Sequence, residues 1–211
     1  MSASGLRAKA LFSIAGALGV YTLMLLGYRH GWVPVFTADA FSVDVSHDIG
    51  LRFPAWVSFW HGVSTVFAPP VFRVLAMFAA IVAAWRRRLR AALFLLVTVE
   101  ATGWITQAVK DSVDRRRPMT ALVEATSSSF PSGHALGVMV GVGALLVVAL
   151  PMLRRHARVT AVCVGALVVA AVGVSRVALA VHYPSDVLAG WSLGWAYLCG
   201  WALVLKPWAD R

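Results

Sequence analysis

KDSVDRRRP at residues 110–118, PSGH at 131–134 and SRVALAVHYPSD at 175–186 are the segments around which this sequence is organised. Each lies at the edge of a long apolar run. Together they supply several cations, two histidines and a carboxylate. Such a set of side chains is suited to handling a phosphate group at a membrane surface.

The composition places these segments in an integral membrane protein. Of the 211 residues, 60% are hydrophobic and 13% are charged, whereas a soluble domain averages about 45–50% and about 25%. A spanning helix needs about 20 apolar residues. We therefore predict an all-α polytopic fold, a bundle of six transmembrane helices. The predicted spans are 10–28, a second ending at 85, 91–109, 134–153, 159–180 and 185–205.

The first third of the chain has a less regular pattern. The run 10–28 lacks a clear small-x-small cleavage site and is interpreted as a retained signal anchor. Residues 29–52 are mixed and polar and are predicted to form a loop outside the bilayer. Residues 53–67 carry aromatic side chains near helical spacing, which fits an interfacial helix or the outer part of a long second span. Pro69-Pro70 should break or kink that helix.

The basic residues indicate an orientation, because cytoplasmic loops carry an excess of Lys and Arg. If the N-terminus is cytoplasmic and the six spans alternate, the inner side receives eleven of the 19 basic residues and one acidic residue, Asp210. We therefore predict that both termini are cytoplasmic. The eleven are Arg7, Lys9, Arg86, Arg87, Arg88, Arg90, Arg154, Arg155, Arg158, Lys206 and Arg211.

One basic cluster falls on the predicted outer side, within a few residues of a span end. It consists of Lys110, Arg115, Arg116 and Arg117. The orientation rule is statistical, and two nearby aspartates offset part of the charge. The functional interpretation is that these cations face an anion.

The PSGH segment resembles the start of a helix. Ser132 stands at a favourable capping position before a long apolar run. The first N–H groups of a helix lack internal partners and bind anions readily. Gly133 would let the backbone approach a ligand, and His134 would lie in the first turn. An ordinary cap with an interfacial histidine fits the tetrapeptide equally well.

The third segment is more specific. His182 and Asp186 are four residues apart, and Pro184 is typical of a first helical position. The carboxylate can then accept from one imidazole nitrogen and leave the other free as a nucleophile or base. Arg176 follows an almost wholly apolar run, where a guanidinium needs a partner or a polar cavity. A surface histidine beside an aspartate favoured by the helix dipole is the plainer alternative.

Metal binding is the competing chemistry. The candidate ligands are His134, His182, Asp186 and His47. Three or more cations accompany them, and these would repel a divalent metal ion. Phosphate without a metal is the better fit.

The three motifs and their order resemble the signature of the type 2 phosphatidic acid phosphatase superfamily. The motifs are Lys-x6-Arg-Pro, Pro-Ser-Gly-His and Ser-Arg-x5-His-x3-Asp. The resemblance covers roughly residues 70–205. It implies a metal-independent membrane phosphatase that acts on lipid phosphomonoesters or diphosphates, of the phosphatidic acid, phosphatidylglycerophosphate or polyprenyl diphosphate class. No cofactor, nucleic acid or obligate protein partner is expected; the partners are the lipid phosphate substrate and membrane lipids.

The resemblance also implies a role for each motif residue. His182 would attack phosphorus and carry a phosphohistidine, and Asp186 would orient it. His134 would protonate the leaving oxygen and then activate water. The phosphoryl oxygens would be held by Lys110, Arg117, Ser132, Gly133 and Arg176. Arg115 and Arg116 are extra cations that contact a second phosphate or only the lipid surface.

We expect a single domain over residues 1–211. Residues 1–69 would hold the first span, the extracytoplasmic loop and the interfacial helix, and residues 70–205 the catalytic helix bundle. The expected location is a bacterial inner membrane, with the site on the extracytoplasmic face. A lipid phosphotransferase and a non-enzymatic scaffold or transporter are the alternatives. Within the bundle, Arg73 and Glu100 should lie at similar depth and form a buried ion pair.

Overall fold

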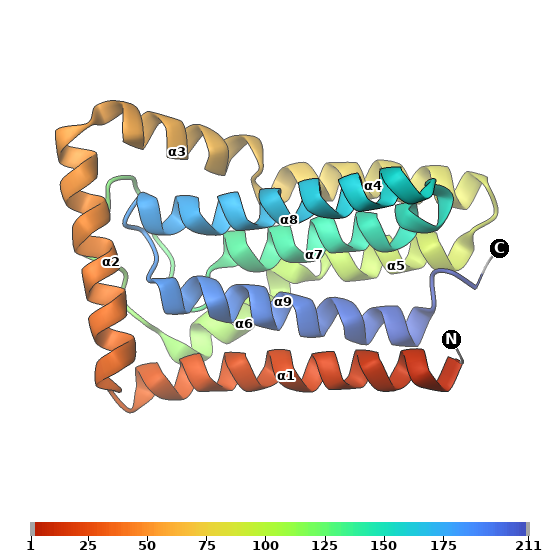
Figure 1. The fold of residues 1–211 in the computed structure, drawn as a ribbon, viewed down its shortest axis with the longest axis horizontal. Coiled ribbons are helices and arrows are strands. Elements are labelled where there is room, and N and C mark those ends of the chain that lie inside the picture. The colour runs from red at the N-terminus through yellow and green to blue at the C-terminus, as the bar shows by residue number, and fades with distance from the viewer. Residues whose placement is uncertain (1–2, 210–211) are drawn as a thin grey trace.

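Helices follow the apolar runs throughout the described part of the chain. The computed structural model describes residues 3–209, and in that range it holds nine α-helices, one short 3-10 helix and no strand (Figure 1). The predicted all-α fold is therefore confirmed. The α-helices are α1 (Ala3–Arg29), α2 (Val33–Arg52), α3 (Pro54–Val66), α4 (Pro69–Trp85), α5 (Leu89–Glu100), α6 (Thr102–Val113), α7 (Gly133–Ala149), α8 (Arg155–Ala178) and α9 (Pro184–Leu205), with the 3-10 helix η1 at Leu150–Met152.

The six predicted spans are present. Within residues 3–209, six helical stretches are long and apolar enough to cross a membrane: Arg7–Arg29, Pro54–Trp85, Leu89–Val113, Gly133–Met152, Arg155–Ala178 and Pro184–Leu205. α1 begins and α9 ends at the same end of the bundle, as an even number of spans requires (Figure 1). The basic turns between α4 and α5 and between α7 and α8 also lie at that end. Asp210 and Arg211, which entered the predicted charge balance, lie outside the described residues.

α2 contradicts the predicted loop over residues 29–52. Residues Val33–Arg52 of this segment form a helix that lies across one end of the bundle (Figure 1). Its buried face consists of Asp39, Val43, Ser46 and Gly50, which recur at helical spacing. Because two of these four residues are polar, the face carries no apolar stripe. Hydrophobic periodicity therefore does not indicate a helix over these residues.

The position of α3 distinguishes between the two interpretations of residues 53–67, an interfacial helix or the outer part of a long second span. It packs along α8 and leads back to α4, so it forms the outer part of a long second span (Figure 1). α2, not α3, is the helix that lies across the bundle end. The predicted break is present, because Ala68 has an extended backbone and α4 starts at Pro69.

The third span is broken at Ala101, whereas one continuous helix was predicted. Thr102 Oγ1 donates a hydrogen bond to the Val99 carbonyl oxygen at 2.7 Å. In a continuous helix that oxygen would accept from the N–H of Gly103. α6 begins at Thr102, packs against α7 and carries Lys110 in its last turn.

The predicted Arg73–Glu100 ion pair is wrong. No ion pair joins these two side chains, although both lie in the described part of the chain. The guanidinium of Arg73 lies instead against α6, where a Cβ at Gly103 would come within 2.7 Å of its Nη2.

α7 is the central helix and packs against α4, α5, α8 and α9. Leu136 and Val140 of α7 join the fully buried Phe94 of α5 in the main apolar core. α9 approaches the start of α7 closely, because a Cβ at Gly190 would lie 2.7 Å from the Ser132 carbonyl oxygen. This packing places the first turns of α7 and α9 side by side, at the end of the bundle opposite the chain termini.

Candidate active site

The three motifs meet at that end of the bundle around one cavity of about 430 Å³. The cavity lies where α4 and α6 flank the start of α7. Its charged and histidine lining combines residues far apart in sequence: Arg73, Lys110, Arg117, Glu124, His134, Arg176 and His182. Cations outnumber carboxylates four to one in this lining, so the cavity is suited to an anionic ligand.

The start of α7 has the predicted form. Ser132 is the N-cap, and its side chain accepts from the backbone N–H of Ala135. The Ser132 N–H donates to the Asp186 carbonyl oxygen at 3.0 Å, which ties the start of α7 to the start of α9. Gly133 and His134 follow in the first turn and line the cavity.

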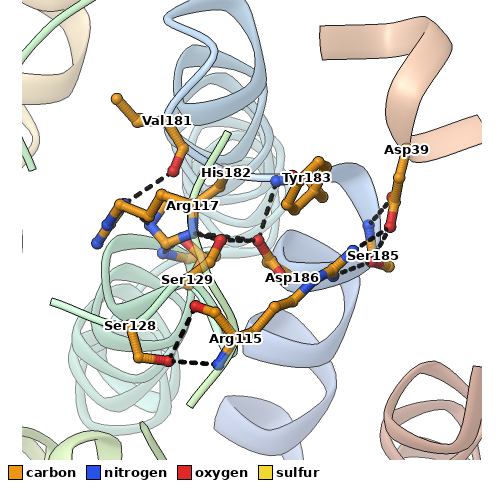
Figure 2. A network of polar contacts seen from close by, with 12 residues as sticks. Asp39, Arg115, Arg117, Ser128, Ser129, Val181, His182, Tyr183, Ser185 and Asp186 are labelled. Carbon is orange, nitrogen blue, oxygen red and sulfur yellow. Dashed lines mark hydrogen bonds and ion pairs between the residues drawn. The ribbon is translucent and has the colours of Figure 1, made fainter. Parts of the chain in front are cut away.

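His182 lies in the turn between α8 and α9, and its side chain is buried (Figure 2). Its Nδ1 is 3.4 Å from Asp186 Oδ2. Since the carboxylate only accepts hydrogen bonds, we assign the proton of the neutral imidazole to Nδ1. Nε2 then carries the lone pair and lies 3.1 Å from Nη1 of Arg117.

Burial lowers the pKa of His182 to about 4, because desolvation disfavours the imidazolium. The hydrogen bond and charge of Asp186 oppose this shift, while Arg117 and Arg176 add to it. The imidazole is therefore neutral at neutral pH. A neutral imidazole with Nδ1 held by a carboxylate has the electronic form required of a nucleophile at Nε2.

Asp186 is held by more groups than the motif indicated. Its side chain is completely buried. Besides His182, it accepts hydrogen bonds from Ser129 Oγ, from the Tyr183 N–H at 2.9 Å and from Arg115 Nη1 at 2.6 Å (Figure 2). These donors satisfy the charged carboxylate and fix its orientation.

The buried position of Arg115 and its partners were not predicted from the sequence. Its guanidinium is buried and bridges Asp186 to Asp39 of α2, with Nη2 2.8 Å from Asp39 Oδ2. It also lies between the rings of Tyr28 and Tyr183, with ring centroids 4.7 and 4.1 Å from its Cζ. Although burial opposes the charged form, the two aspartates raise the pKa of Arg115.

Arg115 is therefore buried and does not line the cavity, whereas a second phosphate or the lipid surface was expected as its partner. Arg116 is exposed. Asp39 reinforces the bridge by accepting from the Ser185 N–H at 3.0 Å. Three neighbouring arginines look alike in sequence. Only the fold separates Arg117, which reaches the cavity, from Arg115, which points into the protein.

The remaining motif cations are fixed by local contacts around the cavity. Lys110 Nζ donates to Ser127 Oγ at 2.9 Å. Arg117 Nη1 donates to the Val181 carbonyl oxygen at 2.8 Å. Arg176 donates from Nη1 to Ser64 of α3, while its buried Nε has no hydrogen-bond partner. The structure thus brings together all eight residues predicted for the site: Lys110, Arg117, Ser132, Gly133, His134, Arg176, His182 and Asp186.

The four residues considered as alternative metal ligands, His47, His134, His182 and Asp186, do not form a metal-binding cluster. Within residues 3–209, no group of three or more His, Cys, Asp or Glu side chains is arranged to hold a metal ion. His47, the fourth candidate, has its Nδ1 2.8 Å from the Thr120 carbonyl oxygen and does not line the cavity.

Comparisons with known proteins agree with this geometry. A family model described as the PAP2 superfamily matches residues 91–209, a range that includes all three motifs. Phosphatidylglycerophosphatase B of Bacillus subtilis (strain 168) is 38% identical over 106 residues, or 48% of this chain. That alignment spans 52% of the relative, about half its length.

A solved structure shows the same fold. It is described as the first transmembrane PAP2 type phosphatidylglycerolphosphate phosphatase from Bacillus subtilis. The match has a TM-score of 0.76 at 23% sequence identity and covers 93% of this chain and 96% of that one. The similarity therefore extends to the helices that precede the family match.

Proposed function

The chain belongs to the PAP2 superfamily, and from this premise we propose that it is a membrane phosphatase that hydrolyses a lipid phosphate of the phosphatidylglycerophosphate class. The observation that carries the proposal is the buried His182–Asp186 pair, whose free imidazole nitrogen is beside Arg117 in a cavity lined by cations. The names of the two similar proteins support this substrate class over phosphatidic acid and polyprenyl diphosphate.

The proposed reaction has two steps. In the first, the Nε2 lone pair of His182 forms a bond to phosphorus while the bond from phosphorus to the lipid oxygen breaks. His134, which is protonated when the anionic phosphate is bound beside it, gives this proton to the departing oxygen, so the lipid leaves as an alcohol. Asp186 stabilises the positive charge that develops on the His182 ring.

In the second step, water replaces the histidine. His134, now neutral, takes a proton from a water molecule whose oxygen attacks phosphorus. The bond to Nε2 breaks, inorganic phosphate is released, and His182 returns to its neutral form. The charge on the phosphoryl oxygens in both steps is balanced by the cations of the cavity and by the first N–H groups of α7. Lys110, Arg117 and Arg176 supply these cations without a metal ion.

The proposed location is a bacterial inner membrane with the cavity on the extracytoplasmic face. The positive turns of the bundle support this orientation, because they lie at the end away from the cavity. A lipid headgroup would then reach the cavity from the outer leaflet.

The first experiment measures phosphate release by detergent-purified protein in EDTA. The substrates are phosphatidic acid, phosphatidylglycerophosphate and a polyprenyl diphosphate. We expect metal-independent release, highest for phosphatidylglycerophosphate. His182→Ala should lower the rate at least about a thousandfold, because it removes the nucleophile. His156→Ala is the matched control, since His156 is exposed at the start of α8.

The intermediate can be trapped separately. With a lipid phosphate that has a good leaving group, acid-labile phosphoprotein should accumulate in His134→Ala and be absent in His182→Ala. Release that survives His182→Ala would overturn the mechanism. Transfer of the phosphoryl group to an alcohol in place of water would identify a phosphotransferase, and the absence of both reactions would favour a scaffold.

A further inference from the structure

Arg73 is a cation in the cavity wall for which neither the mechanism nor the sequence motifs provide a role. It lies near the start of α4, within the second span. Its Nε is buried without a hydrogen-bond partner, and no hydrogen bond or ion pair joins its side chain to other described residues. A guanidinium in a membrane segment is unfavourable unless it pairs or faces a polar cavity. Arg73 faces the cavity.

The charge of Arg73 is not balanced within the protein. Glu100 is not paired with it, and the one carboxylate in the cavity lining belongs to Glu124, which is exposed. Arg73 shares the cavity with Lys110 and Arg176. A planar guanidinium with free donors is suited to two oxygens of a phosphate. The missing partner is therefore an anionic group of the ligand.

Arg73 of α4 contacts α6 about two helical turns away from Lys110, so it lies apart from the cations around His182. Its Nη2 lies against Gly103, whereas Lys110 marks the catalytic end of the same helix face. Seven residues separate Gly103 from Lys110, which corresponds to about 10 Å along the axis. Thr106 and Gln107 line the cavity between them.

This spacing distinguishes between kinds of substrate. The two phosphates of a diphosphate share one oxygen, so they lie closer together than one helical turn of about 5.4 Å. Two phosphates joined through the three carbons of a glycerol can lie farther apart than one turn. Phosphatidic acid has only one phosphate and offers Arg73 no partner.

We propose that Arg73 binds a second phosphate of the substrate, the phosphodiester that a short carbon linker separates from the phosphate being cleaved. This inference rests on the proposed function, since it assumes that the reacting phosphate lies at His182. Arg73 is then a specificity residue. It selects a lipid whose headgroup is a glycerol phosphate over lipids with one phosphate or two adjacent ones.

The kinetic test compares Arg73→Gln with wild type on three lipids. For phosphatidylglycerophosphate, we expect kcat/KM to fall about 10- to 100-fold, mostly through KM, because a charge-assisted contact is lost. For phosphatidic acid and the polyprenyl diphosphate we expect less than about a threefold change. Arg73→Lys should restore part of the loss, and Arg52→Gln, at an exposed position of α2, is the control. Equal losses on all three lipids, or no loss on any, would overturn the proposal.

A binding measurement separates this proposal from the proposed function. Purified His182→Ala protein, which cannot turn over, is titrated calorimetrically with propane-1,3-diol bisphosphate and with propyl phosphate. We expect the added change Arg73→Gln to weaken the bisphosphate about 10-fold or more and to leave propyl phosphate unchanged. If wild type hydrolyses none of the lipids, the proposed function fails, while this difference still supports the role of Arg73. Equal weakening of both ligands contradicts that role.

Discussion

At the scale of single residues, the site depends on how its charges are partnered. Asp186 accepts from several donors, whereas among residues 3–209 the one hydrogen-bonding partner of His182 Nε2 is Arg117. A phosphate that enters the cavity can take over the donors of Arg117 and leave Nε2 facing phosphorus. The same burial that removes water from His182 keeps it neutral well below its ordinary titration range.

The lowered pKa of His182 predicts the acid side of the pH profile. A group whose pKa is lowered to about 4 loses its proton by that pH, so the nucleophile is available at all higher pH values. We expect the acid limb of kcat/KM that belongs to His182 to lie near pH 4. An unperturbed histidine would place it near 6.5.

The substrate must be controlled for in this measurement, because a phosphate monoester itself titrates near pH 6. Profiles are therefore recorded with two lipid phosphates whose own second pKa values differ. A limb that moves between the two belongs to the substrate. A limb near 6.5 that stays in place with both would contradict a neutral, buried His182.

At the scale of elements, α2 contacts the network around the His182–Asp186 pair from outside the span bundle. Asp39 accepts hydrogen bonds from Arg115 and from the N–H of Ser185 in the first turn of α9. Arg115 in turn donates to Asp186. Asp39 and Arg115 thus connect α2, the helix that lies across the bundle end, to the carboxylate beside His182. We therefore predict that Asp39 and Arg115 are positioning residues.

Asp39→Asn tests this connection. The change removes one charge from a buried pair, and we expect the unfolding midpoint in detergent to fall by roughly 5 °C. We also expect kcat to fall about 10- to 100-fold, because Asp186 is less well oriented. KM should change much less, since Asp39 does not line the cavity.

Asp44→Asn is the matched control, because Asp44 lies on the exposed face of the same helix. A double-mutant cycle with Arg115→Met measures whether the two side chains act as a unit. If Asp39→Asn behaves as Asp44→Asn does in both stability and kcat, α2 has no positioning role.

At the scale of the whole molecule, the two ends of the bundle differ in chemistry. One end carries the cavity and the loop between α6 and α7, and the other carries the basic turns and both ends of the described chain (Figure 1). This polarity predicts a fixed orientation, with the cavity outside the cytoplasm.

Two exposed methionines provide a matched test of orientation. Met119 lies in the loop beside the cavity, and Met152 lies in the turn between α7 and α8. In a chain with Cys163 and Cys199 replaced by serine, a membrane-impermeant thiol reagent should label Met119→Cys in intact bacteria. Met152→Cys should react only after the cells are permeabilised. The reverse pattern would show the opposite orientation.

Local sequence features were enough to predict the membrane class, the number of spans, the break at Pro69-Pro70, the helix starts near Ser132 and Pro184, and the eight residues that line or adjoin the cavity. Apolar run length and motif spacing are local properties, so they can be read without the fold. Tertiary structure alone decided three other features: the helix at 33–52, the break at Ala101, and the partners of Asp39, Arg73 and Arg115.

Two of these features have a common physical reason. The helix at 33–52 and the partners of Asp39, Arg73 and Arg115 depend on which polar groups meet across the bundle, and no local pattern encodes this. The buried face of α2 is polar because Asp39 pairs with an arginine 76 residues away. Arg73 lines the cavity and lies against Gly103 of α6, and it does not pair with Glu100. Apolar run length specified which segments cross the membrane, and long-range polar contacts specified how their ends form a site.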